Sequence, residues 1–330
     1  MTTIREVAKL AGVSPATVSR AFRPNTYISE DAKQKIMEAA KTLNYTPNLM
    51  ASGLKSKKSR TVGLIVSDID NPFYSIVTRV LESELKRAGY RLLLSYSHEN
   101  DEQELEDLML LASSRVEGII FTPTGVRNKS FIQSLQQQNI ALMQLYRVAY
   151  KDIDSIVIDD EKGAYMATKH LLQHGHRDIL LLSVDSPISP DRSKGYRAAF
   201  AESNLACNES MIMHLPFQID LSDMIARRIK ETSPTAIIAA TNVIGMIVVK
   251  ICKEMNLKLA HDISLIMFDD VPWASLLDIT AIAQPINNIG LYAGRTIIKR
   301  IQGESQFSGA VTSMLEPQLI ARNSVRNLFS

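Results

Sequence analysis

The sequence is poor in cysteine and has no long apolar run. Its 330 residues include two cysteines, Cys207 and Cys252, which lie far apart and form no Cys-x-x-Cys pair. This excludes a disulfide framework and a zinc knuckle. No stretch of about 18 apolar residues occurs, and the first residues are polar, which argues against a membrane span and an export signal. We therefore expect a cytoplasmic protein without a membrane partner.

Motifs for nucleotide-driven or hydrolytic chemistry are also missing. The 14 glycines form no Gly-x-Gly pair, and the P-loop and the Gly-x-Ser-x-Gly elbow are absent. The acidic pairs Asp159-Asp160 and Asp269-Asp270 come without an identifiable nucleophile. The three histidines of segment 170–176 lack the carboxylate or cysteine partner of a metal site, so we interpret them as part of a helix end and turn. We expect a binding protein rather than an enzyme, with no cofactor and no metal.

The charge of the chain is unevenly distributed. Hydrophobic residues make up 45% and charged residues 22% of the sequence, as in soluble globular proteins, and the length predicts about two domains. Residues 1–60 carry eleven Lys and Arg against four Asp and Glu, a net charge of +7, whereas the remaining residues carry −5. A basic head on an acidic body favours a nucleic-acid partner for the head. The alternative is a basic, solvated surface.

Local signals divide the head into three short helices. The spacing Thr3-x-x-Glu6 is a capping box that begins a helix ending at Ala11. The pair Ser14-Pro15 begins a second helix, which continues to about Phe22, and a third follows over 30–43. Two helices joined by a three-residue turn and braced by a third form a helix-turn-helix, which presents its second helix to the DNA major groove.

The exposed face of the second helix carries side chains suited to DNA. Arg20 can contact a guanine or a phosphate, and Ala16 can meet a thymine methyl group. Thr17 and Ser19 suit phosphates or bases. The alternative is an ordinary three-helix domain with polar surface residues.

The ordered run from Val7 to Arg20, VAKLAGVSPATVSR, is similar to the opening of the LacI/GalR (lactose-repressor/galactose-repressor) family of bacterial transcription regulators. The similarity continues through segment 43–48, LNYTPN, and along essentially the whole chain. One departure is Arg23, where the family usually has asparagine, and whether Arg23 contacts phosphate or bases stays open. The resemblance implies that the DNA-binding residues are Thr3, Ser14, Pro15, Ala16, Thr17, Ser19, Arg20, Arg23, Ser29, Tyr45, Asn48, Leu54 and Lys55.

Segment 47–60 connects the head to the body. It is too short, and with Gly53 too poor in helix propensity, to be helical alone, because isolated helices below about 12 residues are marginal. The resemblance implies a hinge helix that folds when two copies lie in the minor groove and Leu54 wedges between base steps. The alternative is a flexible basic linker, and Ser52 stands where the family commonly has arginine.

From residue 61 onward, short apolar runs alternate with longer amphipathic stretches. The runs predict buried strands at 61–66, 91–94, 118–121 and 140–143, and in a second series at 156–158, 178–182, 236–239 and 263–267. Helical stretches are expected between the first four strands near 72–88, 101–113 and 130–138. Two successive series predict two parallel sheets, with ligands at the carboxyl ends of their strands.

The expected fold is a small all-α helix-turn-helix head followed by an α/β body of two parallel-sheet subdomains. The resemblance implies a periplasmic-binding-protein-like body in which the chain crosses between subdomains three times. We expect a DNA-binding domain over 1–46, a hinge helix and linker over 47–60, and an effector-binding and dimerisation domain over 61–330. Its N-subdomain would comprise about 61–160 and 291–320, and its C-subdomain about 161–290 and 321–330.

The resemblance also implies an effector site at the strand ends. Arg192 presents a rigid fork of donors for hydroxyls or carboxylates, and Asp269 accepts hydrogen bonds, whereas Asp270 is expected to cap a helix or lie at the surface. The implied effector-binding residues are Ser67, Asn71, Phe73, Tyr74, Thr122, Arg192, Phe217, Thr241, Asp269 and Gln284. The pairs Tyr146-Arg147 and Thr241-Asn242 depart from the family's usual aspartate-arginine and asparagine-aspartate, so analogy assigns no sugar.

The sequence thus predicts a homodimeric, sequence-specific DNA-binding regulator, expected to be a repressor. Twofold symmetry implies a palindromic operator in double-stranded DNA, and a small-molecule effector between the subdomains would control its affinity. One alternative keeps the DNA-binding role but makes a phosphocarrier protein the main regulator. The contrasting hypothesis is a small-molecule-binding protein or enzyme with an incidental basic head.

Overall fold

The computed structural model of the protein describes residues 2–22, 26–45, 59–184, 188, 192–217, 220–304 and 309–329. The chain forms two units, Met1–Ser59 and Arg60–Ser330, which we describe separately as the head and the body. Most of the predicted connector, residues 47–58, lies outside the described residues, and so do the predicted contacts of its Leu54 and Lys55.

The head consists of the three predicted helices, α1 (Ile4–Ala11), α2 (Pro15–Ala21) and α3 (Glu30–Thr42). The capping box at Thr3 is formed in both directions, and Ser14 and Ser29 accept hydrogen bonds from backbone N–H groups of α2 and α3. The helices meet in a core made of Val7, Ala8, Ala11, Val18, Ile36, Ala39 and Ala40. A head of this size therefore folds around one small apolar cluster.

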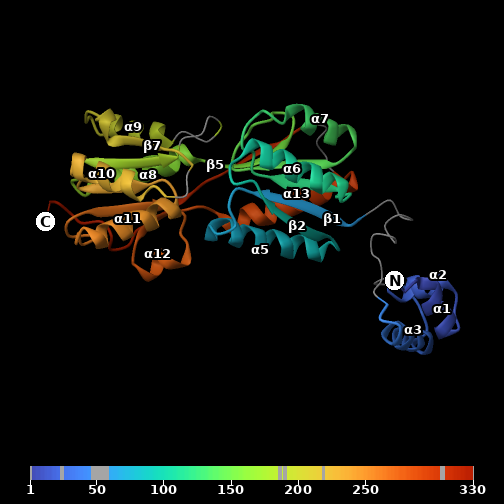
Figure 1. The fold of residues 1–330 in the computed structure, drawn as a ribbon. Helices are drawn as coiled ribbons and strands as arrows, with labels where there is room; N and C mark the ends of the chain where they lie inside the picture. Colours follow the sequence, from blue (N-terminus) through green and yellow to red (C-terminus); the bar gives the residue numbers. More distant parts are fainter. Residues whose placement is uncertain are drawn as a thin grey trace. The chain divides into compact units, whose positions relative to one another are not determined.

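Two six-stranded sheets form the body (Figure 1). The first has the order β11-β5-β4-β3-β1-β2, with all neighbouring strands parallel. Its strands are β1 (Thr61–Val66), β2 (Arg91–Tyr96), β3 (Gly118–Phe121), β4 (Ala141–Leu145), β5 (Asp154–Ile158) and β11 (Thr312–Leu315). The helices α5 (Pro72–Arg87) and α13 (Ile286–Gln302) cover one face, and α6 (Asp101–Ser113) and α7 (Lys129–Gln137) cover the other. We call this sheet and its helices the N-subdomain.

The second sheet has the order β12-β10-β9-β8-β6-β7, and β12 is its one antiparallel strand. Its strands are β6 (Ile179–Val184), β7 (Ile212–Leu215), β8 (Ala236–Ala239), β9 (Ser264–Phe268), β10 (Thr280–Ala283) and β12 (Gln318–Ile320). The helices α8 (Asp160–Gln173) and α9 (Arg192–Glu202) cover one face. The other face is covered by α10 (Ser222–Thr232) and α11 (Asn242–Glu254), and shorter helices are α12 (Pro272–Leu276) and the 3-10 turn η1 (Glu209–Met211). We call this part the C-subdomain.

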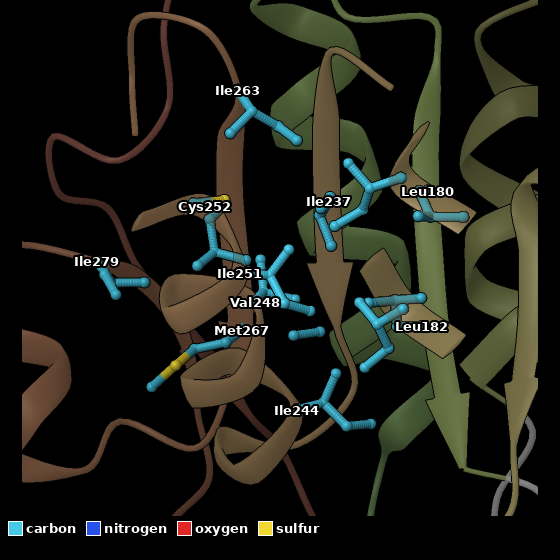
Figure 2. Close-up of a cluster of buried hydrophobic side chains, with 14 of the residues drawn as sticks. Leu180, Leu182, Ile237, Ile244, Val248, Ile251, Cys252, Ile263, Met267 and Ile279 are labelled. Carbon is cyan, nitrogen blue, oxygen red and sulfur yellow. The ribbon is translucent and has the colours of Figure 1, made fainter. Parts of the chain in front are cut away.

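Helix α11 illustrates how the sheet faces are filled. Its side chains Ile244, Val248 and Ile251 recur at helical spacing and lie on one face of the helix. Figure 2 shows these side chains against Leu182 of β6 and Ile237 of β8, and all five are at most 2% exposed. Burial of these apolar side chains holds α11 on the sheet. It thereby positions the end of β8, which α11 follows in the chain.

The eight predicted strands are present, but β2 was predicted as buried and is largely exposed, because it lies at the edge of its sheet. The strands β7, β10, β11 and β12 were not predicted. Three of these four strands have four residues and β12 has three, and β11 is largely exposed, so their apolar signal is weak. Two subdomain crossings lie a few residues before the approximate positions predicted for them. Helix α13 begins at Ile286 and packs on the N-subdomain, where Gly290 meets Val80, so the chain crosses before residue 291. Strand β12 pairs in the second sheet, so the last crossing precedes residue 318.

The histidine segment at the end of α8 has a structural role. Both ring nitrogens of His176 are hydrogen-bonded within the C-subdomain, Nδ1 with Thr235 at 3.0 Å and Nε2 with the backbone carbonyl of Arg326 and with Ser264 at 3.0 Å. Burial lowers the pKa of His176, and burial together with the neighbouring His174 lowers the pKa of His170 to about 4. The fold therefore holds these imidazoles neutral.

We expect acid to destabilise the C-subdomain through these histidines. A pKa lowered by folding means that the unfolded chain binds the proton more readily, so stability is lost as the pH falls below about 6.5. The thermal unfolding midpoint should therefore decrease between about pH 7 and pH 5. His176→Gln should reduce this dependence, while the same change at the exposed His214 should leave it unaltered. Equal pH profiles for all three proteins would contradict the expectation.

Candidate functional site

The second helix of the head exposes part of its surface. Pro15, Ala16 and Arg20 are exposed on α2, whereas Val18 points into the core. Thr17 donates its backbone N–H to Ser14 Oγ at 3.1 Å. Of the predicted recognition residues on α2, Pro15, Ala16 and the basic Arg20 are therefore accessible, and Thr17 and Ser19 are half-buried.

Three predicted DNA-binding residues have a local role as helix caps. Thr3, Ser14 and Ser29 each accept a hydrogen bond from a backbone N–H at the start of a helix. Tyr45, in contrast, packs against Phe22 of the head core, with their ring centroids 6.1 Å apart. Helix N-termini attract phosphate, so caps at these positions are compatible with a DNA backbone contact. The predicted contacts of Arg23 and Asn48 lie outside the described residues.

In the body, Asp269 is the centre of a buried polar cluster. It follows β9, is 3% exposed, and adopts a left-handed backbone conformation with φ of 71°. Its Oδ2 accepts hydrogen bonds from the backbone N–H and the Nδ2 of Asn242, at 3.1 and 2.8 Å, and its Oδ1 accepts one from Gln284. Burial raises the pKa of Asp269, against the opposing effects of Asn242 and of the Arg192 charge. Its carboxylate is thus held in one orientation by amide donors.

One hydrogen bond joins the two subdomains directly at this cluster. Asn71, the N-cap of α5 in the N-subdomain, accepts from Nδ2 of Asn242 in the C-subdomain at 2.8 Å. The predicted Thr241 instead caps α11, because its hydroxyl accepts from the backbone N–H of Ile244 at 3.1 Å. Asn242, which was not in the predicted set, therefore takes the bridging position.

Arg192, the first residue of α9, is held by contacts with three other elements of the C-subdomain. Its guanidinium donates to Oδ1 of Asp160, with Nε at 2.8 Å and Nη2 at 2.6 Å, and it also donates to the carbonyl of Ala240. The same group lies 4.0 Å above the ring of Phe268. The arginine therefore ties α9, α8 and β8 together, as an ion pair with side chains 16% and 7% exposed.

Three aromatic side chains gather at the end of the first sheet. The ring centroids of Phe73, Tyr74 and Tyr146 lie 5.1 to 5.6 Å apart. Burial raises the pKa of Tyr74 to about 12, and burial, Tyr74 and Asp269 raise that of Tyr146. The hydroxyl of Tyr146 is buried without a hydrogen-bond partner among the described residues. Phe73 itself belongs to the apolar core, so the two tyrosines supply the polar groups.

A second buried ion pair lies at the end of the same sheet. Arg147 donates through Nη1 and Nη2 to the two carboxylate oxygens of Glu99, at 2.5 and 2.9 Å, and through Nη1 to the carbonyl of Pro123 at 3.1 Å. Ser67 also donates to Glu99. The hydroxyl of Thr122, which follows β3, is buried and has no partner in the described part of the chain.

We call these strand-end residues the polar junction: Ser67, Asn71, Tyr74, Glu99, Thr122, Tyr146, Arg147, Asp160, Arg192, Asn242, Asp269 and Gln284. Seven members are predicted effector residues. Glu99, Tyr146, Arg147, Asp160 and Asn242 were missed as site residues, although each lies within three residues of a strand end. Phe217, by contrast, is 48% exposed beyond β7 and stacks on no aromatic ring within the described ranges.

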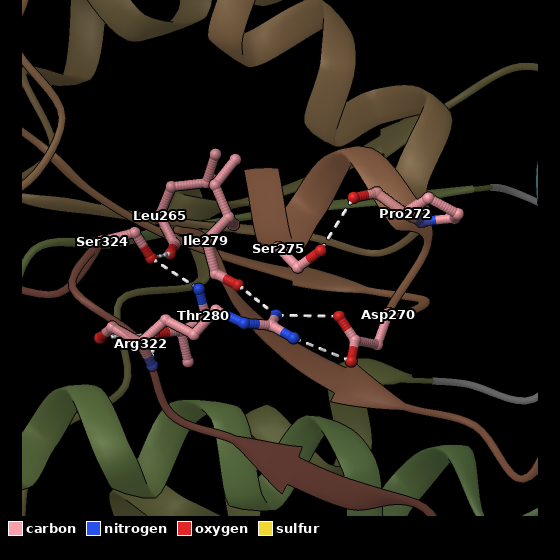
Figure 3. Close-up of polar contacts among 8 residues, drawn as sticks. All are labelled: Leu265, Asp270, Pro272, Ser275, Ile279, Thr280, Arg322 and Ser324. Atoms are coloured by element: carbon pink, nitrogen blue, oxygen red, sulfur yellow. Dashed lines mark hydrogen bonds and ion pairs between the residues drawn. The ribbon is translucent and has the colours of Figure 1, made fainter. Parts of the chain in front are cut away.

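Asp270 differs from its expected role. The N-cap of α12 is Val271, and Asp270 pairs with Arg322, whose Nη1 and Nη2 lie 2.8 and 2.9 Å from its two oxygens (Figure 3). The same arginine donates to the carbonyl of Ile279. Asp270 therefore ties the C-terminal segment to the sheet, away from the polar junction.

Comparison with protein families gives two matches. Residues 3–48 match the bacterial regulatory proteins of the lacI family, and residues 59–315 match the periplasmic binding proteins and sugar binding domain of the LacI family. The chain belongs to the LacI family. It is therefore a DNA-binding transcriptional regulator with a sugar-binding-type body, as the resemblance predicted.

Similar LacI-family proteins match over nearly their whole length. The chain is 31% identical to the transcriptional repressor PurR of Vibrio campbellii, over 99% of this chain and 100% of that protein. It is 32% identical to the ribose operon repressor of Halalkalibacterium halodurans, over 92% and 91%, and 31% identical to catabolite control protein A of Priestia megaterium, over 94% and 95%. The first two of these relatives are named as repressors.

Solved structures agree with the fold of this family member. The lac repressor dimer bound to operator has a TM-score of 0.81 at 22% identity, covering 98% of this chain and 99% of that one. A ribose operon repressor homologue from Burkholderia thailandensis has a TM-score of 0.72 at 26% identity, over 80% of this chain and 100% of that one. Within the described residues, no helix is both long and apolar enough to cross a membrane.

Proposed function

We propose that the protein is a homodimeric cytoplasmic repressor that binds a palindromic operator through α2 and binds a small-molecule effector at the polar junction. The observation that carries this proposal is the bond from Asn242 to Asn71. It places residues of both subdomains in one cluster, so that a molecule binding there acts on both at once. Occupancy would then favour one arrangement of the subdomains, and operator affinity would change with it.

We propose repression, rather than activation, because similar proteins are repressors. PurR and the ribose operon repressor are both named as repressors. In this family member an effector changes operator affinity only to the extent that it binds the two states of the body unequally. The proposed repressor therefore requires an effector with different affinities for the DNA-bound and the free protein.

Exposed apolar side chains support the dimer. The edge strand β2 exposes Leu93, Leu94 and Tyr96, each more than 40% accessible, and α6 exposes Met109 and Leu110 by more than 50%. An edge strand with apolar side chains is unfavourable in a monomer. We propose a second copy of the chain as its partner, as in the lac repressor dimer of similar fold.

The DNA-binding part of the proposal is tested at Arg20. Arg20→Ala should weaken operator binding roughly 10- to 100-fold, because a bidentate arginine contact to guanine contributes about 1–3 kcal/mol. The operator is first obtained by selection from random duplexes with the full-length protein, and affinity is then measured by fluorescence anisotropy at fixed salt.

Lys35→Ala is the matched control, since Lys35 is exposed on α3 and pairs with Asp31. It removes the same charge away from α2 and should change operator affinity only slightly. Equal losses for the two variants would mean that Arg20 acts only through its charge. Selected sites without twofold symmetry would contradict the dimer.

A further inference from the structure

The sheet of the N-subdomain carries opposite charges at its two ends. Segments 67–71 and 97–100, which follow β1 and β2, contain Asp68, Asp70 and Glu99 and neither lysine nor arginine. Segments 59–61 and 86–91, which lead into the same two strands, contain four lysines and arginines and no acidic residue. Residues 61–330 as a whole carry a net charge of −5, so the end where these strands begin differs from the rest of the body.

The starts of three strands lie side by side at this end. Arg91, the first residue of β2, donates its backbone N–H to the carbonyl of Arg60 at 2.8 Å. Glu117, directly before β3, donates its backbone N–H to the carbonyl of Thr61, the first residue of β1, also at 2.8 Å. Arg115 lies two residues before Glu117. Neighbouring strands are about 4.8 Å apart, so these three arginines belong to one surface.

Two helices end at the same place and add lysines. Helix α5 leads into β2, and its last turn carries Lys86. The last turn of α13 carries Lys299, and Ile301 of that turn lies next to Gly118, the first residue of β3. We call this surface the basic end, and its five members are all exposed: Arg60, Lys86, Arg91, Arg115 and Lys299.

In the part of the chain that the structure describes, no member of the basic end makes an ion pair. The ion pairs nearby belong to their neighbours in sequence, since Arg87 pairs with Glu84 and Arg300 pairs with Asp154. The positive charges of the basic end therefore face solvent and are open to an external anion.

Local stability explains only part of this charge. The C-terminus of a helix favours cations, which accounts for Lys86 and Lys299 but not for Arg60 and Arg91, which lie on no helix. Glu117 accepts the backbone N–H of Arg60 at 2.5 Å, and its charge offsets one of the five cations. The remaining like charges repel one another, which disfavours the folded body until an anionic partner neutralises them.

We infer that the basic end binds the phosphate backbone of DNA, so that the body itself adds to the affinity that the head provides. The chain leads from Arg60 through the connector to the DNA-binding head. DNA bound by the head is therefore present at a high effective concentration for the basic end. Phosphate contacts carry no sequence information, so this contribution is equal for all duplexes. The inference goes beyond the proposed function, which assigns DNA binding to α2.

The test neutralises two cations of the basic end that lie outside β2 and α6, the elements proposed to form the dimer. Full-length Lys86→Gln with Arg115→Gln is compared with the unaltered protein by fluorescence anisotropy, between about 50 and 200 mM NaCl. The ligands are the selected operator and a duplex of scrambled sequence. Each lost phosphate contact reduces the slope of log affinity against log salt by about 0.9. We expect a slope smaller by about 2 and a roughly tenfold loss of affinity at low salt on both duplexes.

Arg227→Gln with Lys230→Gln is the matched control. Both residues are exposed on α10 of the C-subdomain and make no ion pair within the described ranges. The control removes the same charge from the body and should change neither the slope nor the affinity. Equal losses in the two double variants overturn the inference, and so does an unchanged slope in Lys86→Gln with Arg115→Gln.

Lysine acetylation tests the same surface in the unaltered protein, where no variant has to fold. Addition of operator should reduce the acetylation rate of Lys86 and Lys299 at least threefold, as measured by mass spectrometry of peptide fragments. Lys230 should keep its rate. Rates at Lys86 and Lys299 that are the same with and without DNA contradict a contact at the basic end.

The inference and the proposed function fail in different ways. Arg20→Ala should reduce the preference for the operator over the scrambled duplex, whereas Lys86→Gln with Arg115→Gln should keep that preference. A loss of preference in the double variant would assign these residues to sequence recognition and overturn the inference. An unaffected Arg20→Ala would count against the role of α2 and leave the salt dependence of the basic end as independent support.

Discussion

Arg192→Met is expected to lower the free energy of unfolding of the body by about 3–5 kcal/mol and to abolish the effect of effector on operator binding. The substitution leaves the carboxylate of Asp160, 7% exposed, without its cation. An unpaired buried charge costs more than the ion pair contributes, which is why the stability loss is large. Chemical denaturation measures the first effect. Operator titration with and without a metabolite extract of the cells that carry the gene measures the second.

The double variant Arg192→Met with Asp160→Asn separates the two effects. Removing both charges should restore most of the stability, because no unpaired carboxylate remains, while the effector response stays lost. Arg300→Met is the matched control, since Arg300 pairs with Asp154, whose side chain is 4% exposed, outside the polar junction. It should cost stability and keep the response. A normal response in Arg192→Met would contradict a role for Arg192 in the site.

Gly195→Ala is expected to prevent stable folding of the C-subdomain or to lower its free energy of unfolding by about 3 kcal/mol or more. A methyl group at this position of α9 would overlap the carbonyl oxygen of Glu161 and would lie 2.7 Å from the backbone nitrogen of Tyr165, both on α8. Backbone atoms inside a helix cannot rotate away as a flexible side chain can. The two helices would have to move apart, and this would disrupt the apolar core that they share.

Thermal unfolding of the full-length protein checks this expectation. Gly309→Ala is the matched control, because a methyl group there has no neighbour within 4 Å in the described part of the chain. It should leave the unfolding midpoint within a degree or two, whereas Gly195→Ala should lower it by roughly 10 °C or give insoluble protein. An unchanged midpoint for Gly195→Ala would show that α8 and α9 are not in close contact.

Much of the fold was predictable because its signals are local. The capping box at Thr3 and the proline after Ser14 mark the starts of α1 and α2 within a few residues of sequence. Long apolar runs such as those of β1 and β6 identify strands that are buried on both faces. The short strands β11 and β12 carry no such run, and they form only through pairing with β5 and β10, which lie far away in the sequence.

The candidate site was predictable only in part, because its contacts join distant segments. Glu99 and Arg147 follow different strands, and nothing in the neighbourhood of either residue shows that they pair. The same holds for Asp160 and Arg192, which adjacent helices bring together. A position at the end of a strand makes a residue a candidate for the site. Its ion-pair partner depends on which strands and helices lie side by side in the fold.

Two adjacent pairs separate what the sequence determined from what the tertiary structure decided. The sequence by itself determined that Thr241-Asn242 and Asp269-Asp270 follow buried strands, and so lie at the edge where ligands bind. Only the tertiary structure decided that Asn242 and Asp269 enter the polar junction, while Thr241 caps α11 and Asp270 pairs with Arg322. The reason is geometric, since successive residues leaving a strand point to opposite sides, and the packing of the subdomains determines which side faces the site.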